Sequence, residues 1–272
     1  MDWLDALLLG VVQGLSEYLP ISSSGHLEIF REILGLDLSG EDALEFDVAL
    51  HVATVLSTIV VLWREFLPLC KSFFTFARDD NFYYVCKILL SCIPVAIVGL
   101  CFKDFVESFF GGGLTVVGIC LLVTACLLGF AYYFRNPARE ARNHERGHDI
   151  TWLDAFIIGC SQAIAVLPGL SRSGTTIATG LLLGDKRDKI AQFSFFMVII
   201  PILGEAMLSV KDLIAGEGMG QSVGFFPLAI GFIAAFVVGC IACKWMIELV
   251  KKGKLVWFAL YCLAVGILCI VW

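Results

Sequence analysis

The chain has 272 residues, of which 59% are hydrophobic and 16% are charged, and its formal net charge is −6. A soluble domain of this size would need more charge to cover its surface, so the composition excludes an ordinary soluble protein and indicates apolar surface that faces lipid. Most of the 11 cysteines stand singly in apolar runs. They form no Cys/His cluster that predicts a zinc site or a disulfide framework, and we expect no nucleic-acid partner.

One sequence frame occurs twice in the chain. Residues 3–10 read WLDALLLG, and residues 152–159 read WLDAFIIG. At the same offset, without gaps, further positions coincide in pairs: Gln13 with Gln162, Ser22 with Ser171, Ser24 with Ser173, and Gly25 with Gly174. Agreement at this many polar and glycine positions is not expected by chance. We therefore divide the chain into a first repeat, 1–149, and a second repeat, 150–272, within one structural domain.

Each repeat opens with two short helical segments, at 3–36 and at 152–184. Each begins with acidic residues, and Thr151 and Asp154 have the spacing of a helix N-cap with an acid at the third helical position. The apolar stretches are shorter than the roughly 20 residues that cross a bilayer, and the polar residues between them could not face lipid with unpaired backbone groups. We therefore predict two re-entrant helical hairpins whose loops are buried in protein or line a wet cavity.

Longer apolar runs follow each hairpin and predict three membrane spans per repeat. The expected spans lie at about 46–64, 83–102, 114–134, 190–209, 223–243 and 255–272. A re-entrant hairpin returns to its own side, so three spans would invert the second repeat relative to the first, as in many transporters. The predicted fold is an all-α integral membrane protein with an inverted-topology repeat, about six transmembrane helices and two re-entrant hairpins.

Lysine and arginine are distributed unequally between the two sides that this topology defines. Most of the 19 basic residues, including those of the stretch at 135–146, fall on the side opposite to the N-terminus. By the positive-inside rule that side is cytoplasmic. We therefore expect the N-terminus and the opening of the active site to be extracytoplasmic.

The first hairpin carries polar residues that could support chemistry. Gln13 and Glu17 are four apart and share one helix face, and an ionisable side chain at membrane depth is a functional candidate by default. The loop SSSGH at 22–26 leads into a helix, so its backbone N–H groups and the helix dipole predict a phosphate cradle. Ser23 and His26 are three apart, and we expect their side chains to approach each other, as in an activated nucleophile or a proton donor.

Arg172, in the second loop SRSG at 171–174, occupies the repeat position of Ser23. Its guanidinium is suited to bidentate binding of a phosphate. Two inverted hairpins would meet tip to tip near mid-membrane, which would bring Glu17, Ser23 and His26 against Arg172. The alternative is a buried ion pair between Glu17 and Arg172 that only locks the two repeats together.

Three segments carry a resemblance to a known family: GVVQGLSEYLPISSSGH, FDVALHVATVL and LPGLSRSGTTIATGLLLG. With them the chain resembles, essentially from end to end, the undecaprenyl-diphosphate phosphatases of the BacA/UppP type. The resemblance implies hydrolysis of a polyprenyl diphosphate lipid, undecaprenyl diphosphate, to undecaprenyl phosphate and inorganic phosphate in the bacterial cell membrane. It also implies recycling of the carrier lipid for peptidoglycan synthesis and resistance to bacitracin.

The family's motifs fall on the polar residues of the two loops. The implied catalytic residues are Glu17, Ser23, His26 and Arg172. The implied phosphate- or substrate-binding residues are Gln13, Ser22, Ser24, Gly25, Gly169, Ser171, Ser173 and Gly174. The chain has Gln13 where many relatives have Glu, and Ser24 where Thr is common. The family implies a divalent cation, Mg²⁺ or Ca²⁺, and the scarcity of carboxylates here would place it between Glu17 and the diphosphate.

Several alternatives stay open on the sequence alone. Either Ser23 attacks the terminal phosphorus, or water attacks directly with His26 or Glu17 as the base. Asp47 and His51, four apart in the first span, either support the site or are interfacial residues. An inverted repeat with broken helices also suits a lipid-phosphate transporter or flippase, although a transporter has no need of a Ser–His pair. The assembly state, with a homodimer as one option, is open as well.

Overall fold

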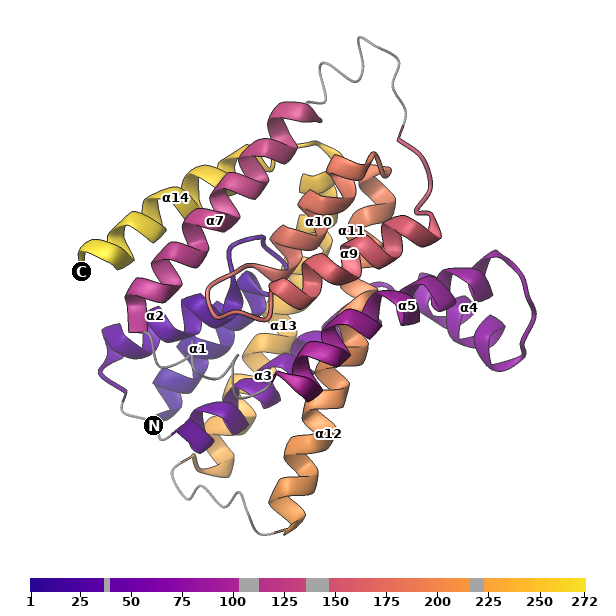
Figure 1. Ribbon diagram of the computed structural model, residues 1–272. Coiled ribbons are helices and arrows are strands. Elements are labelled where there is room, and N and C mark those ends of the chain that lie inside the picture. Colours follow the sequence, from indigo (N-terminus) through magenta and orange to yellow (C-terminus); the bar gives the residue numbers. More distant parts are fainter. Residues whose placement is uncertain (37–39, 103–112, 136–146, 216–222) are drawn as a thin grey trace.

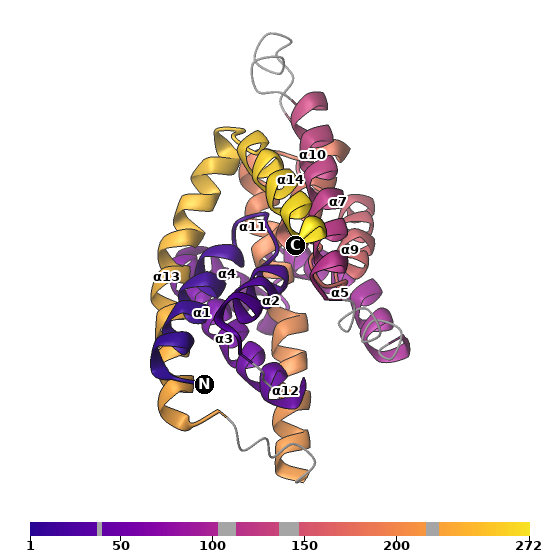
Figure 2. The same cartoon turned by 90° about the vertical axis from the view of Figure 1, so that its left-hand side faces the viewer.

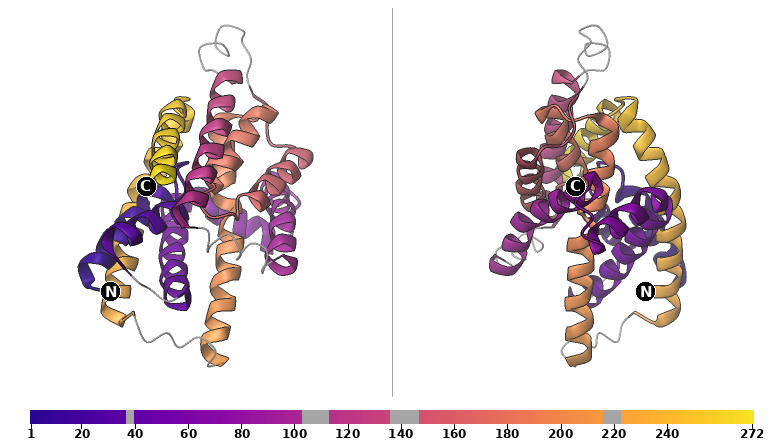
Figure 3. Two further views of the ribbon diagram at one scale, coloured as in Figure 1. Left: turned by 60° about the vertical axis from the view of Figure 1, so that its left-hand side comes forward. Right: turned by 90° about the vertical axis from the view of Figure 1, so that its right-hand side faces the viewer.

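The computed structural model describes residues 1–36, 40–102, 113–135, 147–215 and 223–272. These segments are helical, apart from turns and one isolated backbone bridge between His148 and Asp185. The helices are α1 (Trp3–Ser16), α2 (Ser23–Leu34), α3 (Gly40–Val61), α4 (Trp63–Phe74), α5 (Asp80–Cys101), α7 (Gly113–Phe134), α9 (Trp152–Ile164), α10 (Arg172–Leu183), α11 (Arg187–Met197), α12 (Ile199–Ala215), α13 (Phe225–Lys251) and α14 (Val256–Val271). Figure 1 shows their arrangement, and Figures 2 and 3 show it from other sides.

Within the described segments, five stretches of helix are long and apolar enough to cross a membrane. They are Ala43–Val61, Asp80–Cys101, Gly113–Phe134, Arg187–Leu208 and Phe225–Lys251. A shorter apolar helix of 16 residues, α14, follows as the counterpart of the sixth predicted span. The prediction of an all-α integral membrane protein is confirmed. The inverted orientation of the second repeat stays a prediction.

The span predicted at 190–209 is divided into two helices. α11 ends at Met197 and α12 begins at Ile199, with a turn at Val198 between them. Pro201 explains the break, because proline lacks the N–H that would donate to the Met197 carbonyl and its ring clashes with that carbonyl. The break places Val198 in the wall of the pocket described below.

The sequence-based prediction missed α4, a helix of 12 residues between the first two spans. Leu69 and Ser72 are buried on one face, whereas Trp63, Leu67 and Phe74 are exposed. Such a short amphipathic helix has too few consecutive apolar residues to register as a span. In Figure 1, α4 lies beside α5 at the edge of the helical body.

The two segments predicted as hairpins form helix–loop–helix units, α1–α2 and α9–α10, and their re-entrance into the membrane stays a prediction. α1 begins with a capping box formed by Asp2 and Asp5, and α9 begins with the predicted one formed by Thr151 and Asp154. Each box satisfies backbone N–H groups that the first helical turn leaves without an intrahelical partner. The two units therefore start with the same local chemistry.

One pair of helix contacts repeats when the two halves are exchanged. α1 packs against α13, the second span of the other half, and α9 packs against α5. A methyl group added at Gly10 would lie 2.4 Å from the Gly231 carbonyl oxygen, and one added at the repeat-equivalent Gly159 would lie 2.4 Å from the Ser91 carbonyl oxygen. Both contacts are close backbone approaches of the kind that small residues permit between membrane helices. The equivalence of these two contacts agrees with the sequence repeat that pairs Gly10 with Gly159.

Part of the predicted charge asymmetry cannot be placed in the fold. Most of the basic stretch at 135–146 lies outside the described residues. The extracytoplasmic position of the N-terminus therefore stays a prediction from the distribution of basic residues.

Candidate active site

The loops of the two hairpins are in direct contact with each other. Ser173 Oγ donates a hydrogen bond to the Leu19 carbonyl oxygen at 3.3 Å. A methyl group added at Gly25 would lie 3.0 Å from Gly169 Cα, so the two glycine backbones touch. The meeting of the hairpin tips that we expected from the repeat is therefore present.

Gly169 occupies a position that no other residue type can readily fill. Its φ of +85° lies in the left-handed region, and an added methyl group would come within 2.7 Å of Val117 Cα. The second loop therefore packs directly on the backbone of α7. This close approach sets the position of the chain just before α10.

Ser22 and Ser171 are the N-caps of α2 and α10. The backbone N–H of Gly25 donates to Ser22 Oγ at 3.2 Å, and that of Gly174 donates to Ser171 Oγ at 3.0 Å. Each cap holds its loop in shape and leaves the positive end of a helix dipole at the loop. The phosphate-binding role of the two serines stays a prediction, because their observed contacts are those of helix caps.

Glu17, just after the last residue of α1, connects four other side chains of the site. Its Oε2 accepts hydrogen bonds from Gln13 Nε2 at 2.9 Å and from Ser23 Oγ at 2.7 Å. Its Oε1 lies 3.3 Å from Arg172 Nη2. Ser23 and Arg172 are the first residues of α2 and α10, so the repeat places a hydroxyl and a guanidinium at equivalent helix starts. The carboxylate side chain is only 9% exposed.

His51, on α3, is the fourth partner of Glu17. Its Nε2 lies 3.4 Å from Glu17 Oε2, and its Nδ1 donates to the Asp47 carbonyl oxygen at 2.8 Å. Since Nδ1 keeps its hydrogen for that carbonyl, Nε2 can donate to Glu17 only when the ring is protonated. The Asp47 carboxylate pairs with Arg31. This geometry favours the interpretation that Asp47 and His51 support the site.

His26 does not form the side-chain contact that we expected with Ser23. Its Nδ1 donates to the Ser22 carbonyl oxygen at 2.8 Å, and its Nε2 therefore accepts from the Tyr261 hydroxyl at 2.7 Å. The two rings are also stacked, with centroids 5.6 Å apart. Tyr261 was missed because a single tyrosine in the apolar α14 gives no sequence signal. His26 thus anchors the first loop to α14, and the Ser23 hydroxyl is held by Glu17 instead.

A pocket opens beside Glu17 and Arg172. It is lined by Glu17, Tyr18, Thr54, Val55, Thr58, Arg172, Ser173, Ser194, Phe195, Val198 and Ile202. Charged and hydroxyl-bearing side chains form one part of this lining, and aliphatic and aromatic side chains form the other. The lining therefore offers both polar and apolar contacts beside the carboxylate and the guanidinium.

The fold and the pocket together define a class: a multi-pass helical membrane protein in which a carboxylate, a serine hydroxyl and a guanidinium converge where two helices begin. A family model described as bacitracin resistance protein BacA matches residues 6–268, and the chain belongs to this family.

Three relatives that match the whole chain are named undecaprenyl-diphosphatase. The chain is 54% identical to the undecaprenyl-diphosphatase of Bacteroides fragilis over 271 residues, which is 100% of this chain and 98% of the relative. It is 53% identical to that of Bacteroides thetaiotaomicron, with 100% and 99% covered. It is 47% identical to that of Christiangramia forsetii, with 100% and 98% covered.

Proposed function

We infer that this chain is an undecaprenyl-diphosphatase, which hydrolyses undecaprenyl diphosphate to undecaprenyl phosphate and inorganic phosphate. Its membership of the BacA family and its full-length similarity to enzymes of that name support this function. The reaction recycles the lipid carrier of cell-wall synthesis, and it confers resistance to bacitracin. The observation that carries the chemistry is the hydrogen bond from Ser23 Oγ to Glu17 Oε2, with Arg172 beside it.

Ser23 is the nucleophile in the mechanism that we propose. As its Oγ attacks the terminal phosphorus, Glu17 accepts the hydroxyl proton across the 2.7 Å hydrogen bond. The bond from phosphorus to the bridging oxygen breaks, and undecaprenyl phosphate leaves with that proton. Water then attacks the phosphoserine and gives a proton to Glu17. The bond from phosphorus to Ser23 Oγ breaks, Glu17 returns the proton to that oxygen, and inorganic phosphate leaves. Glu17 thus has the proton-transfer role that the sequence analysis left open between Glu17 and His26.

Arg172 binds the phosphoryl group that is transferred. Its guanidinium lies at the start of α10, beside the positive end of that helix dipole. Both features offset the negative charge on the phosphoryl oxygens, and such electrostatic stabilisation dominates catalysis of phosphoryl transfer. In the structure the Glu17 carboxylate pairs with this guanidinium. Substrate binding would replace part of that ion pair with a pair between phosphate and arginine.

The residues present fit a divalent cation that is shared with the substrate. Glu17 is the only carboxylate among the pocket-lining residues. Mg²⁺ is commonly bound through one or two carboxylates together with substrate phosphates. Glu17 and the diphosphate oxygens would hold the ion, which would supply positive charge at the transferred phosphoryl group.

Phosphate release by the purified protein tests the proposed function directly. The protein in detergent should release inorganic phosphate from undecaprenyl diphosphate and not from undecaprenyl phosphate, which lacks the phosphoric anhydride. The lipid-phosphate transporter is the competing function, and the names of the relatives do not favour it. No release in detergent, together with movement of the lipid phosphate across liposome membranes, would reverse the assignment.

The membrane and the orientation are part of the same proposal. We place the protein in the bacterial plasma membrane, with the N-terminus and the opening of the pocket on the extracytoplasmic side. Six spans and two re-entrant hairpins would leave the C-terminus on that side too. An alkaline phosphatase fused to the C-terminus should then be active and a fluorescent protein should be dark. The opposite pair of results would invert the proposed orientation.

A further inference from the structure

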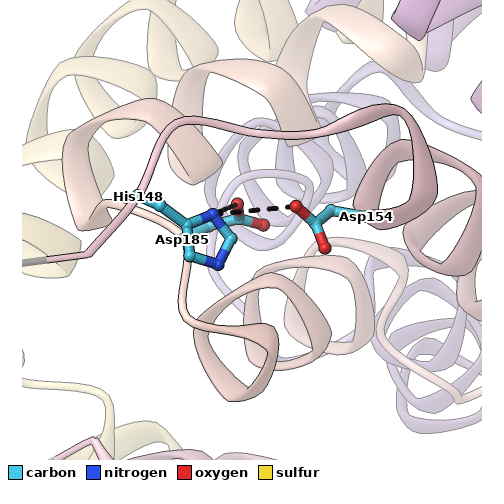
Figure 4. Close-up of side chains that lie close together, drawn as sticks. All are labelled: His148, Asp154 and Asp185. Carbon is cyan, nitrogen blue, oxygen red and sulfur yellow. Dashed lines mark ion pairs between the residues drawn. The ribbon is translucent and has the colours of Figure 1, made fainter.

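Three potential metal ligands meet away from the pocket, around the two ends of the second hairpin. His148 precedes α9, Asp154 lies in the first turn of α9, and Asp185 lies in the turn between α10 and α11. Figure 4 shows the three side chains converging from these separate segments. None of them belongs to the pocket lining or touches Glu17, so the mechanism described above makes no use of them.

The separations of the ligand atoms suit a single bound ion. His148 Nδ1 lies 3.5 Å from Asp185 Oδ1 and 3.7 Å from Asp154 Oδ2, and the three ligand atoms all lie within 4.8 Å of one another. An ion bound at about 2.0–2.2 Å by nitrogen and oxygen ligands separates neighbouring ligand atoms by roughly 3–4 Å. One ion can therefore reach all three groups after small side-chain movements.

Asp185 is the observation that distinguishes this cluster from an ordinary acidic surface. Its side chain is fully buried, and neither carboxylate oxygen has a hydrogen-bond partner. A buried carboxylate without partners is costly, and native proteins rarely leave one unsatisfied. The Lys87 ammonium donates to the Ile150 carbonyl oxygen at 2.6 Å, and Arg135 is a further positive charge near Asp185.

The other two ligands are already oriented by their surroundings. His148 Nε2 lies 3.2 Å from the Leu183 carbonyl oxygen, and donation to that oxygen leaves the Nδ1 lone pair facing the carboxylates. Such outer hydrogen bonds are typical of metal-binding histidines. The Thr151 backbone N–H donates to Asp154 Oδ2 at 2.8 Å. The Asp149 carbonyl oxygen, 3.1 Å from His148 Nδ1, is available as a fourth ligand.

The backbone around the cluster is also fixed. The His148 N–H donates to the Gly184 carbonyl oxygen, and the Lys186 N–H donates to the His148 carbonyl oxygen, both at 3.0 Å. This bridge holds the segment before α9 against the turn that carries Asp185. An ion at this position would join the start of the second hairpin to its end.

We propose that His148, Asp154 and Asp185 form a binding site for a divalent first-row transition cation such as Zn²⁺, separate from the substrate pocket. One imidazole nitrogen with carboxylate and carbonyl oxygens suits Zn²⁺ or Mn²⁺ better than Ca²⁺, which takes six to eight oxygen ligands. The ion neutralises the two carboxylates and connects the two ends of the second hairpin.

Metal binding by the full-length protein tests this site. The protein is purified in detergent without a polyhistidine tag, stripped with a chelator, and titrated with Zn²⁺ while bound metal is measured after equilibrium dialysis. We expect one Zn²⁺ per chain at this site. Asp185→Asn and His148→Gln should each weaken that binding at least about tenfold, because each removes a ligand. Asp149→Asn is the matched control: its carboxylate is 73% exposed and pairs with Lys186, so Zn²⁺ binding should persist.

Two further measurements distinguish Zn²⁺ bound at this site from an ion in the substrate pocket, and loss of a ligand from misfolding of the variant. Glu17→Gln should keep the Zn²⁺ that Asp185→Asn loses. Zn²⁺ should raise the unfolding temperature of the wild type and of Asp149→Asn but not that of Asp185→Asn, and the metal-free Asp185→Asn protein should unfold no earlier than the metal-free wild type. Wild-type Zn²⁺ affinity in both ligand variants would overturn the proposal. Failure of the wild type to bind Zn²⁺ would also overturn it, and would identify His148 as an imidazolium held by the two carboxylates.

Discussion

Arg172 Nη2 lies 3.3 Å from Glu17 Oε1, although the two residues are 155 positions apart in the sequence. Each side chain comes from a different hairpin: Arg172 is the first residue of α10, and Glu17 follows the last residue of α1. The site is therefore assembled only when the two halves of the chain meet. The same carboxylate also accepts the Ser23 hydroxyl, so in the proposed mechanism the group that activates Ser23 is also the partner of Arg172.

The ion pair between Glu17 and Arg172 predicts that a second substitution restores stability without restoring activity. Arg172→Ala leaves a buried carboxylate without its charged partner and should lower the unfolding free energy by about 1–3 kcal/mol. Adding Glu17→Gln to that variant should restore most of the loss, yet both variants should be inactive. Thermal unfolding in detergent and phosphate release measure the two effects. Arg64→Ala, at an exposed arginine, is the control and should change neither.

The hydrogen bond from Ser23 to Glu17 predicts a covalent intermediate. Ser23→Ala should lose at least about 10³-fold in turnover, because the nucleophile is absent. Acid quenching of the wild type should trap phosphoserine at this residue. Ser161→Ala is the matched control, since the Ser161 hydroxyl bonds only to the Ile158 carbonyl of its own helix. Turnover near the wild-type rate in Ser23→Ala would instead favour direct attack by water.

The contact between His26 and Tyr261 predicts a positioning role for Tyr261. Tyr261→Phe removes the hydroxyl that donates to His26 Nε2 and keeps the stacked ring. A hydrogen bond worth about 1 kcal/mol corresponds to a loss of roughly fivefold in kcat/KM. If Tyr261 only positions the first loop, the pH profile of kcat/KM should keep the same shape in Tyr261→Phe as in the wild type. Tyr133→Phe, at a tyrosine that is 69% exposed, should behave as the wild type.

The contact between Gly169 and Val117 predicts that the second loop tolerates no side chain. Gly169→Ala would place a methyl group 2.7 Å from Val117 Cα at a φ of +85°. We expect a destabilisation of about 2 kcal/mol or more, with loss of phosphate release, because the backbone rather than a flexible side chain must move. Gly129→Ala, in an open position on α7, should be neutral or stabilise the helix by about 1 kcal/mol. Equal unfolding temperatures for the two variants would contradict this account.

Several features of the site could be predicted because they depend on local sequence. The capping box of Thr151 and Asp154, and the start of helices directly after Ser22 and Ser171, follow from residue types at fixed spacings. The meeting of Glu17 with Arg172 followed from the repeat. The break after Met197 could have been found from Pro201, which the prediction treated as part of a continuous span.

Other features had no local signal. The three-residue spacing allowed Ser23 to face His26, but Ser23 bonds to Glu17 and His26 bonds to Tyr261 on the last helix. The choice between these partners depends on how helices rotate and cross, and spacing along one helix does not report that. The convergence of His148 with Asp185 depends on the same long-range packing.

The sequence by itself determined that the chain is a helical membrane protein with two matched hairpins, because apolar composition, helix caps and repeated motifs are properties of the chain. It also identified the polar residues of the two loops, since the bilayer makes such residues costly unless they serve a purpose. Only the tertiary structure decided which of their atoms touch, because those contacts join residues of separate helices, and the contact with Arg172 joins the two halves of the chain. The pairing of Glu17 with Ser23, His51 and Arg172 is therefore a property of the packed helices.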